Sequence, residues 1–178
     1  MKKTNVKKLA VSAAMLAIGF LLPLLTAQIK EIGDTLLPMH LPVMLCGLLC
    51  GPQYGVIVGL LLPFLRSAFF SMPPIYPNAV WMSLELMTYG LVIGLLYGRG
   101  QTFNLRRLYI ALITAMLSGR VVWGITKAVL LGVAGRGFTV GAFLVGGFAD
   151  AVPGIILQLI FIPLIMKILD RTRLTDMK

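Results

Sequence analysis

The fold is decided by the apolar stretch from Met39 to Phe70, which reads MHLPVMLCGLLCGPQYGVIVGLLLPFLRSAFF. Its middle, Gly51-Pro52-Gln53-Tyr54-Gly55, interrupts the apolar run. Proline cannot donate to the helical hydrogen-bond ladder and glycine relaxes the backbone, so a Gly-Pro pair favours a break. We therefore interpret the stretch as two rather short helices, residues 36–50 and 54–70, joined by a tight hairpin.

The composition of the whole chain places these helices in a membrane. Of the 178 residues, 58% are hydrophobic and 12% are charged, and the mean hydropathy is +0.94. Soluble proteins have about 45–50% apolar and about 25% charged residues. A domain of this size has too little interior to bury so much apolar surface. The composition excludes a soluble enzyme, a disordered protein and a disulfide-stapled secreted domain, and it predicts an all-α integral membrane protein.

Four further apolar segments approach the roughly 20 residues that a membrane-spanning helix needs. The basic N-terminus followed by an apolar run superficially resembles a signal peptide, but it lacks a small-residue cleavage site, so we expect a retained first helix. We expect a kink at Pro153, inside the last helix. The sequence thus predicts one domain, residues 1–178, with six transmembrane helices at 9–27, 36–50, 54–70, 78–97, 108–131 and 142–168.

The distribution of basic residues predicts the orientation. With six spans and a cytoplasmic N-terminus, only Lys30, Arg66 and Arg136 lie outside, with Arg66 at the lipid–water interface. Fusing the second and third spans would move the basic loop after the fourth helix outside, against the positive-inside rule. Both termini are therefore predicted to be cytoplasmic, with eleven bases on that side: Lys2, Lys3, Lys7, Lys8, Arg99, Arg106, Arg107, Lys167, Arg171, Arg173 and Lys178.

Four ionisable residues lie well within the predicted spans. A charge inside a bilayer is costly, and an intramembrane ionisable residue therefore suggests a functional site. At 1.5 Å per residue, Glu85, Lys127 and Asp150 lie about 7–12 Å below the outer surface, and Arg120 lies at about 18 Å. They cluster toward the outer half, where a ligand would enter.

The spacing of these residues predicts a cavity. The fourth and fifth helices each carry a polar residue, a tryptophan and a charge at positions i, i+3 and i+7, which form one stripe on a helix. Two facing stripes would offer aromatic planes for stacking and charges for orienting a polar ligand. The predicted substrate-binding residues are Asn78, Trp81, Glu85, Arg120, Trp123, Lys127 and Asp150, joined by His40 and Tyr76 from the outer loops.

The alternative interpretation is structural. Two ion pairs, Glu85 with Lys127 and Asp150 with Arg120, would lock the bundle without binding anything. The protein would then be a membrane scaffold or assembly factor, and it would tolerate Glu85→Gln together with Lys127→Met. Buried ion pairs are often replaceable by apolar packing, however, which favours the cavity.

Enzymatic chemistry is not expected from this sequence. One histidine cannot form a histidine metal cluster, and Cys46 and Cys50 are expected to be small packing residues on one helix face. No nucleotide-binding loop is present. We predict no catalytic residue, metal or cofactor, and no nucleic acid partner, because the positive charge of +10 follows the helix ends.

Small residues recur on the first helix, at Ala10, Ala13, Ala14 and Ala17. Small residues four apart let a second helix approach closely in lipid. They would serve either packing within this chain or contact with a partner.

The stretch His40-Leu41-Pro42-Val43-x-x-x-Gly47-x-x-x-Gly51-Pro52-x-x-Gly55-x-x-x-Gly59, with six short helices and cytoplasmic basic ends, resembles the substrate-binding S components of energy-coupling factor (ECF) vitamin transporters. The resemblance implies capture of a small water-soluble vitamin or cofactor precursor at the outer face of a bacterial cell membrane. It also implies a membrane coupling subunit and two cytoplasmic ATPases as partners, for ATP-driven uptake. The helix-one alanines, Ala10, Ala13, Ala14 and Ala17, would be the docking contact.

The resemblance leaves the substrate open among three chemical types. These are an acid such as pantothenate, a cationic or amine-bearing heterocycle such as a thiamine or queuosine precursor, and a neutral compound such as pyridoxine or riboflavin. A stand-alone secondary transporter remains a further alternative, although the internal inverted repeats common in such carriers are not seen.

Overall fold

The computed structural model describes residues 3–24, 36–97, 103–135 and 137–171, and the regular structure in these ranges is helical. Irregular or tighter helical turns are labelled η. The elements are α1 (Lys3–Leu21), η1 (Leu22–Leu24), α3 (His40–Cys50), α4 (Pro52–Phe70), η2 (Ile75–Ala79), α5 (Val80–Tyr97), α6 (Leu105–Val133), α7 (Val140–Leu144), η3 (Val145–Ala149) and α8 (Val152–Arg171).

Five helical segments of the described chain are long and apolar enough to cross a membrane: Val6–Leu24, Pro52–Phe70, Ile75–Tyr97, Leu105–Val133 and Val140–Asp170. The predicted all-α membrane fold is therefore confirmed. The second predicted span differs, because α3 has only 11 residues. At 1.5 Å per residue it is about 16 Å long, roughly half of a bilayer's hydrocarbon core.

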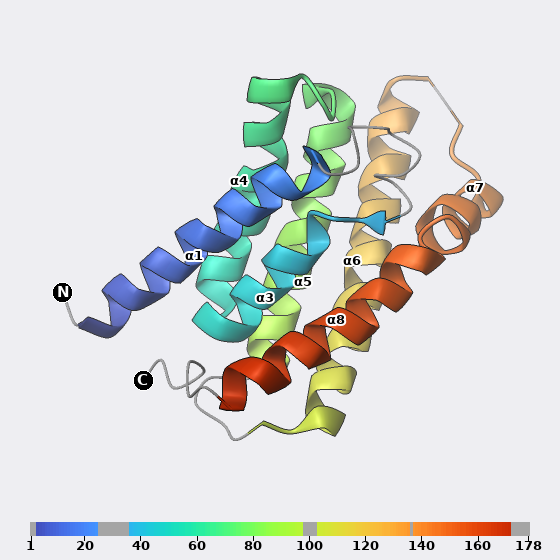
Figure 1. The fold of residues 1–178 in the computed structure, drawn as a ribbon. Coiled ribbons are helices and arrows are strands. Elements are labelled where there is room, and N and C mark those ends of the chain that lie inside the picture. Colours follow the sequence, from blue (N-terminus) through green and yellow to red (C-terminus); the bar gives the residue numbers. More distant parts are fainter. Residues whose placement is uncertain (1–2, 25–35, 98–102, 136, 172–178) are drawn as a thin grey trace.

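Successive elements α1, α3, α4, α5, α6 and α8 run in alternating directions through the bundle (Figure 1). The start of α1, the α3–α4 turn, the end of α5, the start of α6 and the end of α8 all lie at one end. The ends of α1, α4 and α6 lie at the other. Residues 25–27 of the first predicted helix, and the bases Lys2, Lys30, Arg99, Arg136, Arg173 and Lys178, lie outside the described residues.

The Gly-Pro hairpin is confirmed. Gly51 separates α3 from α4 and has a φ of 98°, a value that favours glycine because a side chain would clash there. Pro52 is the first residue of α4, where its missing N–H leaves no helical bond unmade. Gly51 and Pro52 thus form the predicted break, and each lies at a backbone position that suits its residue type.

Glycines bring α3, α4 and α5 into backbone contact. A Cβ placed on Gly90 of α5 would lie 2.4 Å from the carbonyl carbon of Gly55 in α4, and one on Gly47 of α3 would lie 2.7 Å from the Gly90 oxygen. Real Cβ atoms do not approach so closely. We call Gly47, Gly55 and Gly90 the glycine contact. It sets the spacing of the three central helices, as small residues do in membrane bundles.

The last predicted helix is interrupted. Residues Asp150 and Ala151 form a turn between η3 and α8, immediately before the predicted kink at Pro153. Proline disfavours helical geometry in the residue before it and leaves a backbone acceptor unpaired. The interruption gives the residues before it a different direction from α8 (Figure 1).

The two cysteines are packing residues, as predicted. Cys46 and Cys50 are buried free thiols on α3. Cys46 Sγ donates to Ser12 Oγ at 3.6 Å, and Cys50 Sγ donates to the Lys8 carbonyl oxygen at 3.5 Å. They hold α3 against α1.

Candidate functional site

A cavity of about 430 Å³ lies between η1, the start of α3, the end of α4, the start of α5, the second half of α6 and η3. Eight of the nine predicted site residues line it: His40, Asn78, Trp81, Glu85, Arg120, Trp123, Lys127 and Asp150. The ninth, Tyr76, is not among the lining residues, and its side chain is 58% exposed. Tyr76 has an extended backbone, with φ −122° and ψ 134°, inside the irregular turn η2.

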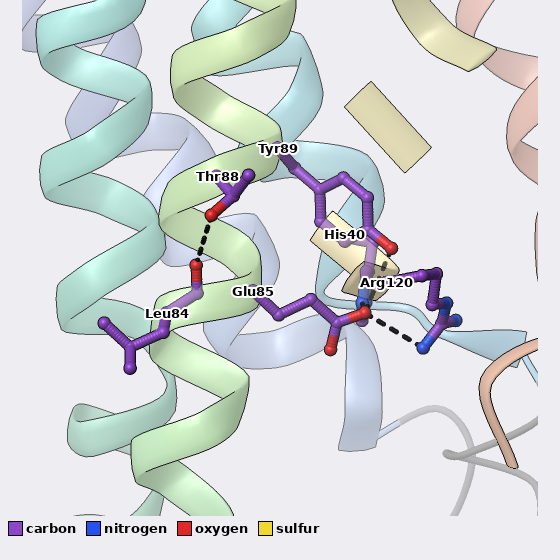
Figure 2. Close-up of polar contacts among 6 residues, drawn as sticks. All are labelled: His40, Leu84, Glu85, Thr88, Tyr89 and Arg120. Atoms are coloured by element: carbon purple, nitrogen blue, oxygen red, sulfur yellow. Dashed lines mark hydrogen bonds and ion pairs between the residues drawn. The ribbon is translucent and has the colours of Figure 1, made fainter. Parts of the chain in front are cut away.

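Glu85 is the centre of a buried polar cluster, which Figure 2 shows on one side of α5. Its side chain is 2% exposed. Glu85 Oε1 accepts from Arg120 Nη1 at 2.9 Å and from the Tyr89 hydroxyl at 3.0 Å. His40 Nε2 lies 3.5 Å from the same oxygen. Because these side chains come from α3, α5 and α6, one carboxylate connects three helices.

Helical spacing and one glycine position this cluster. Glu85 and Tyr89 are four residues apart and therefore project from the same face of α5, whereas Thr88 lies on another face and donates to the Leu84 carbonyl oxygen at 2.8 Å (Figure 2). A Cβ on Gly119 of α6 would lie 2.7 Å from the Tyr89 ring. Gly119 thus makes room for the tyrosine, and Arg120 follows it directly.

Aromatic rings surround the ammonium group of Lys127. Its Nζ lies 4.4 Å from the Trp123 ring centroid, 5.3 Å from that of Trp81 and 5.4 Å from that of Phe138. A cation held over a ring face gains about 0.5–2 kcal/mol. Gly146 and Gly147 leave space for the far edge of Trp123, whose atoms would lie 3.4 Å from a Cβ at either position. The cavity thus has a fixed cation among stacking surfaces.

Comparison with known families identifies the chain. The family model described as ECF transporter, substrate-specific component, matches residues 7–166. This chain belongs to that family. Comparisons with curated proteins and with solved structures gave no match. An ECF S component is a substrate-specific transport component rather than a member of an enzyme family, and this one is a multi-pass membrane protein, with five long apolar helices in the part of the chain that the structure describes.

The ion pairs of the structural alternative are wrong in their partners. Glu85 pairs with Arg120, not with Lys127, and Arg120 is therefore not the partner of Asp150. Asp150 is exposed at the cavity rim. Among the described residues of this S component, Glu85 and Arg120 form a buried ion pair, and Lys127 and Asp150 also line the cavity.

Arg66 was expected at the lipid–water interface, and this is wrong. Arg66 is 3% exposed and lines the cavity. Its Nη1 donates to the Phe20 carbonyl oxygen at 2.7 Å, near the end of α1. A cation satisfies the free carbonyls there and complements the helix dipole. The sequence does carry a signal: Arg66 is seven residues after Gly59, which places it on the glycine-bearing inner face of α4.

The four alanines of α1 are all exposed, and the opposite face of the helix packs on α3 and α4. Packing within the chain, one of the two roles considered for Ala10, Ala13, Ala14 and Ala17, is therefore not their role in the described structure. Among the described residues, no group of three or more His, Cys, Asp or Glu side chains is close enough to hold a metal ion.

Proposed function

We propose that this S component captures a small water-soluble vitamin or cofactor precursor in the cavity, from the outer side of a bacterial plasma membrane. The bound molecule is then taken up by an ATP-driven importer, formed with a membrane coupling subunit and two cytoplasmic ATPases. The cavity lined by Trp81, Trp123 and five charged side chains carries this proposal. Aromatic planes and a few convergent polar groups are typical of small-molecule sites.

We propose six crossings, with both termini in the cytoplasm. α1 and α4 run in the same direction (Figure 1), so the chain between them must return across the bilayer. α3 covers only part of that distance, and Leu37 to Met39, just before it, line the cavity. A break at this depth is tolerated where backbone lines a protein cavity instead of lipid.

The proposed contacts follow from chemistry. Trp81 and Trp123 stack on a ring of the substrate, and Lys127 or Arg120 binds an anionic or carbonyl oxygen. Glu85 or Asp150 accepts from a hydroxyl or amine group of the substrate. Asn78 and His40 supply further polar contacts along the wall, and Tyr76 extends the site at the outer rim.

Native mass spectrometry of protein gently purified from cells grown in rich medium tests capture. We expect a bound small molecule with the unaltered protein and its loss in Lys127→Met, since Lys127 has its ammonium among the tryptophans of the cavity. Lys167→Met is the matched control, because Lys167 is exposed near the far end of α8. Equal occupancy in both variants would exclude Lys127 as a contact, and absence of any bound molecule would count against capture.

The exposed alanines are the proposed docking face for the coupling subunit. Ala14→Trp is expected to abolish co-purification with that subunit, because a bulky side chain keeps two helices apart in lipid. Binding of the small molecule should survive, since Ala14 faces away from the other helices. Ile113→Trp on α6, at a position 48% exposed, is the control. If both variants retain the partner, docking uses another face.

A further inference from the structure

The cavity wall contains buried nitrogen atoms that lack hydrogen-bond partners among the described residues. They are Nε and Nη2 of Arg120 and Nδ1 of His40, whose other ring nitrogen, Nε2, lies 3.5 Å from Glu85 Oε1. Arg120 is 4% exposed, His40 is 2% exposed, and both line the cavity. Buried polar groups are bonded in about nine cases of ten in folded proteins, and a buried charged donor is the most costly exception. A buried donor of this kind is therefore expected to bind an acceptor, which a ligand in the cavity would supply.

The unpaired donors of Arg120 have a defined geometry. Nη1 is already bonded to Glu85 at 2.9 Å, so Nε and Nη2 are the donors that remain. Nε and Nη2 form one edge of that plane, and their N–H groups point the same way. This edge is the fork that binds both oxygens of a carboxylate or phosphate in parallel. A hydroxyl or a single carbonyl would fill only half of it.

The charge of the cavity wall selects between these anions. Three cations, Arg66, Arg120 and Lys127, face two anions, Glu85 and Asp150. Over the described residues of the wall these formal charges sum to +1, which one negative charge on a ligand would neutralise. A phosphate monoester carries about −1.5 to −2 at neutral pH, and it would leave an excess negative charge in a low-dielectric site. The balance favours a monoanion.

We infer that the substrate carries a single carboxylate, bound by the Nε/Nη2 edge of Arg120 beside His40, with its apolar or ring portion against Trp123 and Trp81. This inference rests on the proposed function, since it names the chemical class of the captured molecule. Both nitrogens lie below the cavity surface, so the carboxylate reaches them as the Arg120 side chain turns toward it. Glu85 accepts from Nη1 at 2.9 Å and anchors one end of the guanidinium as it turns.

Tryptophan fluorescence of the purified protein tests the inference directly, because both tryptophans of the chain line the cavity. The probes are acids matched with neutral analogues: nicotinate with nicotinamide, pantothenate with pantothenol, and biotin with its amide. We expect an acid to bind about 10-fold to 100-fold more tightly than its neutral partner, the range for hydrogen bonds to charged groups.

Arg120→Lys separates the fork from the charge. Lysine keeps a cation near Glu85 but cannot form two parallel bonds, so the preference for the acid should fall by about 10-fold, the effect of losing one hydrogen bond to a charged group. The preference should persist in Arg106→Lys, a matched change at an exposed position near the start of α6. Monodisperse elution and thermal unfolding establish that each variant is folded. An Arg120→Lys protein that keeps the full preference would overturn the role of the fork.

Fragmentation of a molecule that co-purifies with the protein completes the test. A carboxyl group in that molecule supports the inference. A neutral, cationic or phosphorylated molecule bound in the cavity overturns the inference but leaves capture intact. If no molecule co-purifies and no probe alters the fluorescence, the proposed capture function fails, and the carboxylate inference fails with it.

Discussion

Arg120→Met is expected to destabilise the protein by about 3–5 kcal/mol, and the addition of Glu85→Gln is expected to restore most of that loss. The single change leaves the Glu85 carboxylate, which is 2% exposed, without its cation at 2.9 Å. An isolated buried charge is far more costly than a buried neutral amide. Glutamine also keeps an oxygen for the Tyr89 hydroxyl, which now donates to Glu85 at 3.0 Å.

Thermal or denaturant unfolding in detergent micelles measures both variants. Arg106→Met is the control, because this residue is exposed at the far end of α6, and it should change stability by less than about 0.5 kcal/mol. A double variant no more stable than Arg120→Met alone would show that the charge pair is not what the single change disrupts. It would place the loss in packing of the arginine stem instead.

The same double variant distinguishes stability from function. Its fold should be restored, but it lacks the Nε/Nη2 edge that the proposed substrate needs. A stable double variant that still binds a small molecule with unaltered affinity would support a purely structural pair, the scaffold interpretation in a corrected form. Loss of binding in a well-folded protein would assign the arginine to the ligand.

Much of the fold follows from composition and a few backbone-specific residues. Apolar runs identify where helices lie, because bilayer insertion depends on summed side-chain transfer energies. Gly51 and Pro52 act within their own few residues, so the α3–α4 turn could be located from sequence. The shortness of α3 was not predicted, although the sequence carries a signal: Pro38 disfavours helical geometry in the residue before it, and Leu37 has a φ of 51°.

The sequence predicted which residues line the cavity, but it did not predict which charged side chains pair with one another. The i, i+3, i+7 spacing places Trp81 and Glu85 on one face of α5, and Arg120 and Lys127 on one face of α6. Spacing within a helix does not tell how far one helix is shifted along its axis relative to its neighbour. That offset depends on close contacts such as the Tyr89 ring at Gly119, and it brings Arg120 rather than Lys127 to Glu85.

Gly90→Ala is expected to destabilise the bundle by about 3 kcal/mol, at the upper end of the range for overpacking. The new methyl carbon would lie 2.4 Å from the Gly55 carbonyl carbon and 2.5 Å from its oxygen. Both atoms are backbone, so no side-chain rotation relieves the clash and α4 must move away from α5. Since α5 carries Glu85 and Trp81, and α4 carries Arg66, the same movement should also weaken ligand binding.

Gly132→Ala is the matched control, because a Cβ there has no atom within 4 Å. In the last turn of α6 this change should be neutral or stabilising by up to about 1 kcal/mol, since alanine loses less backbone freedom than glycine on folding. Thermal unfolding in detergent compares the two variants. If Gly90→Ala were as stable as Gly132→Ala, the three central helices would be held by side-chain packing, and the glycine contact would not set their spacing.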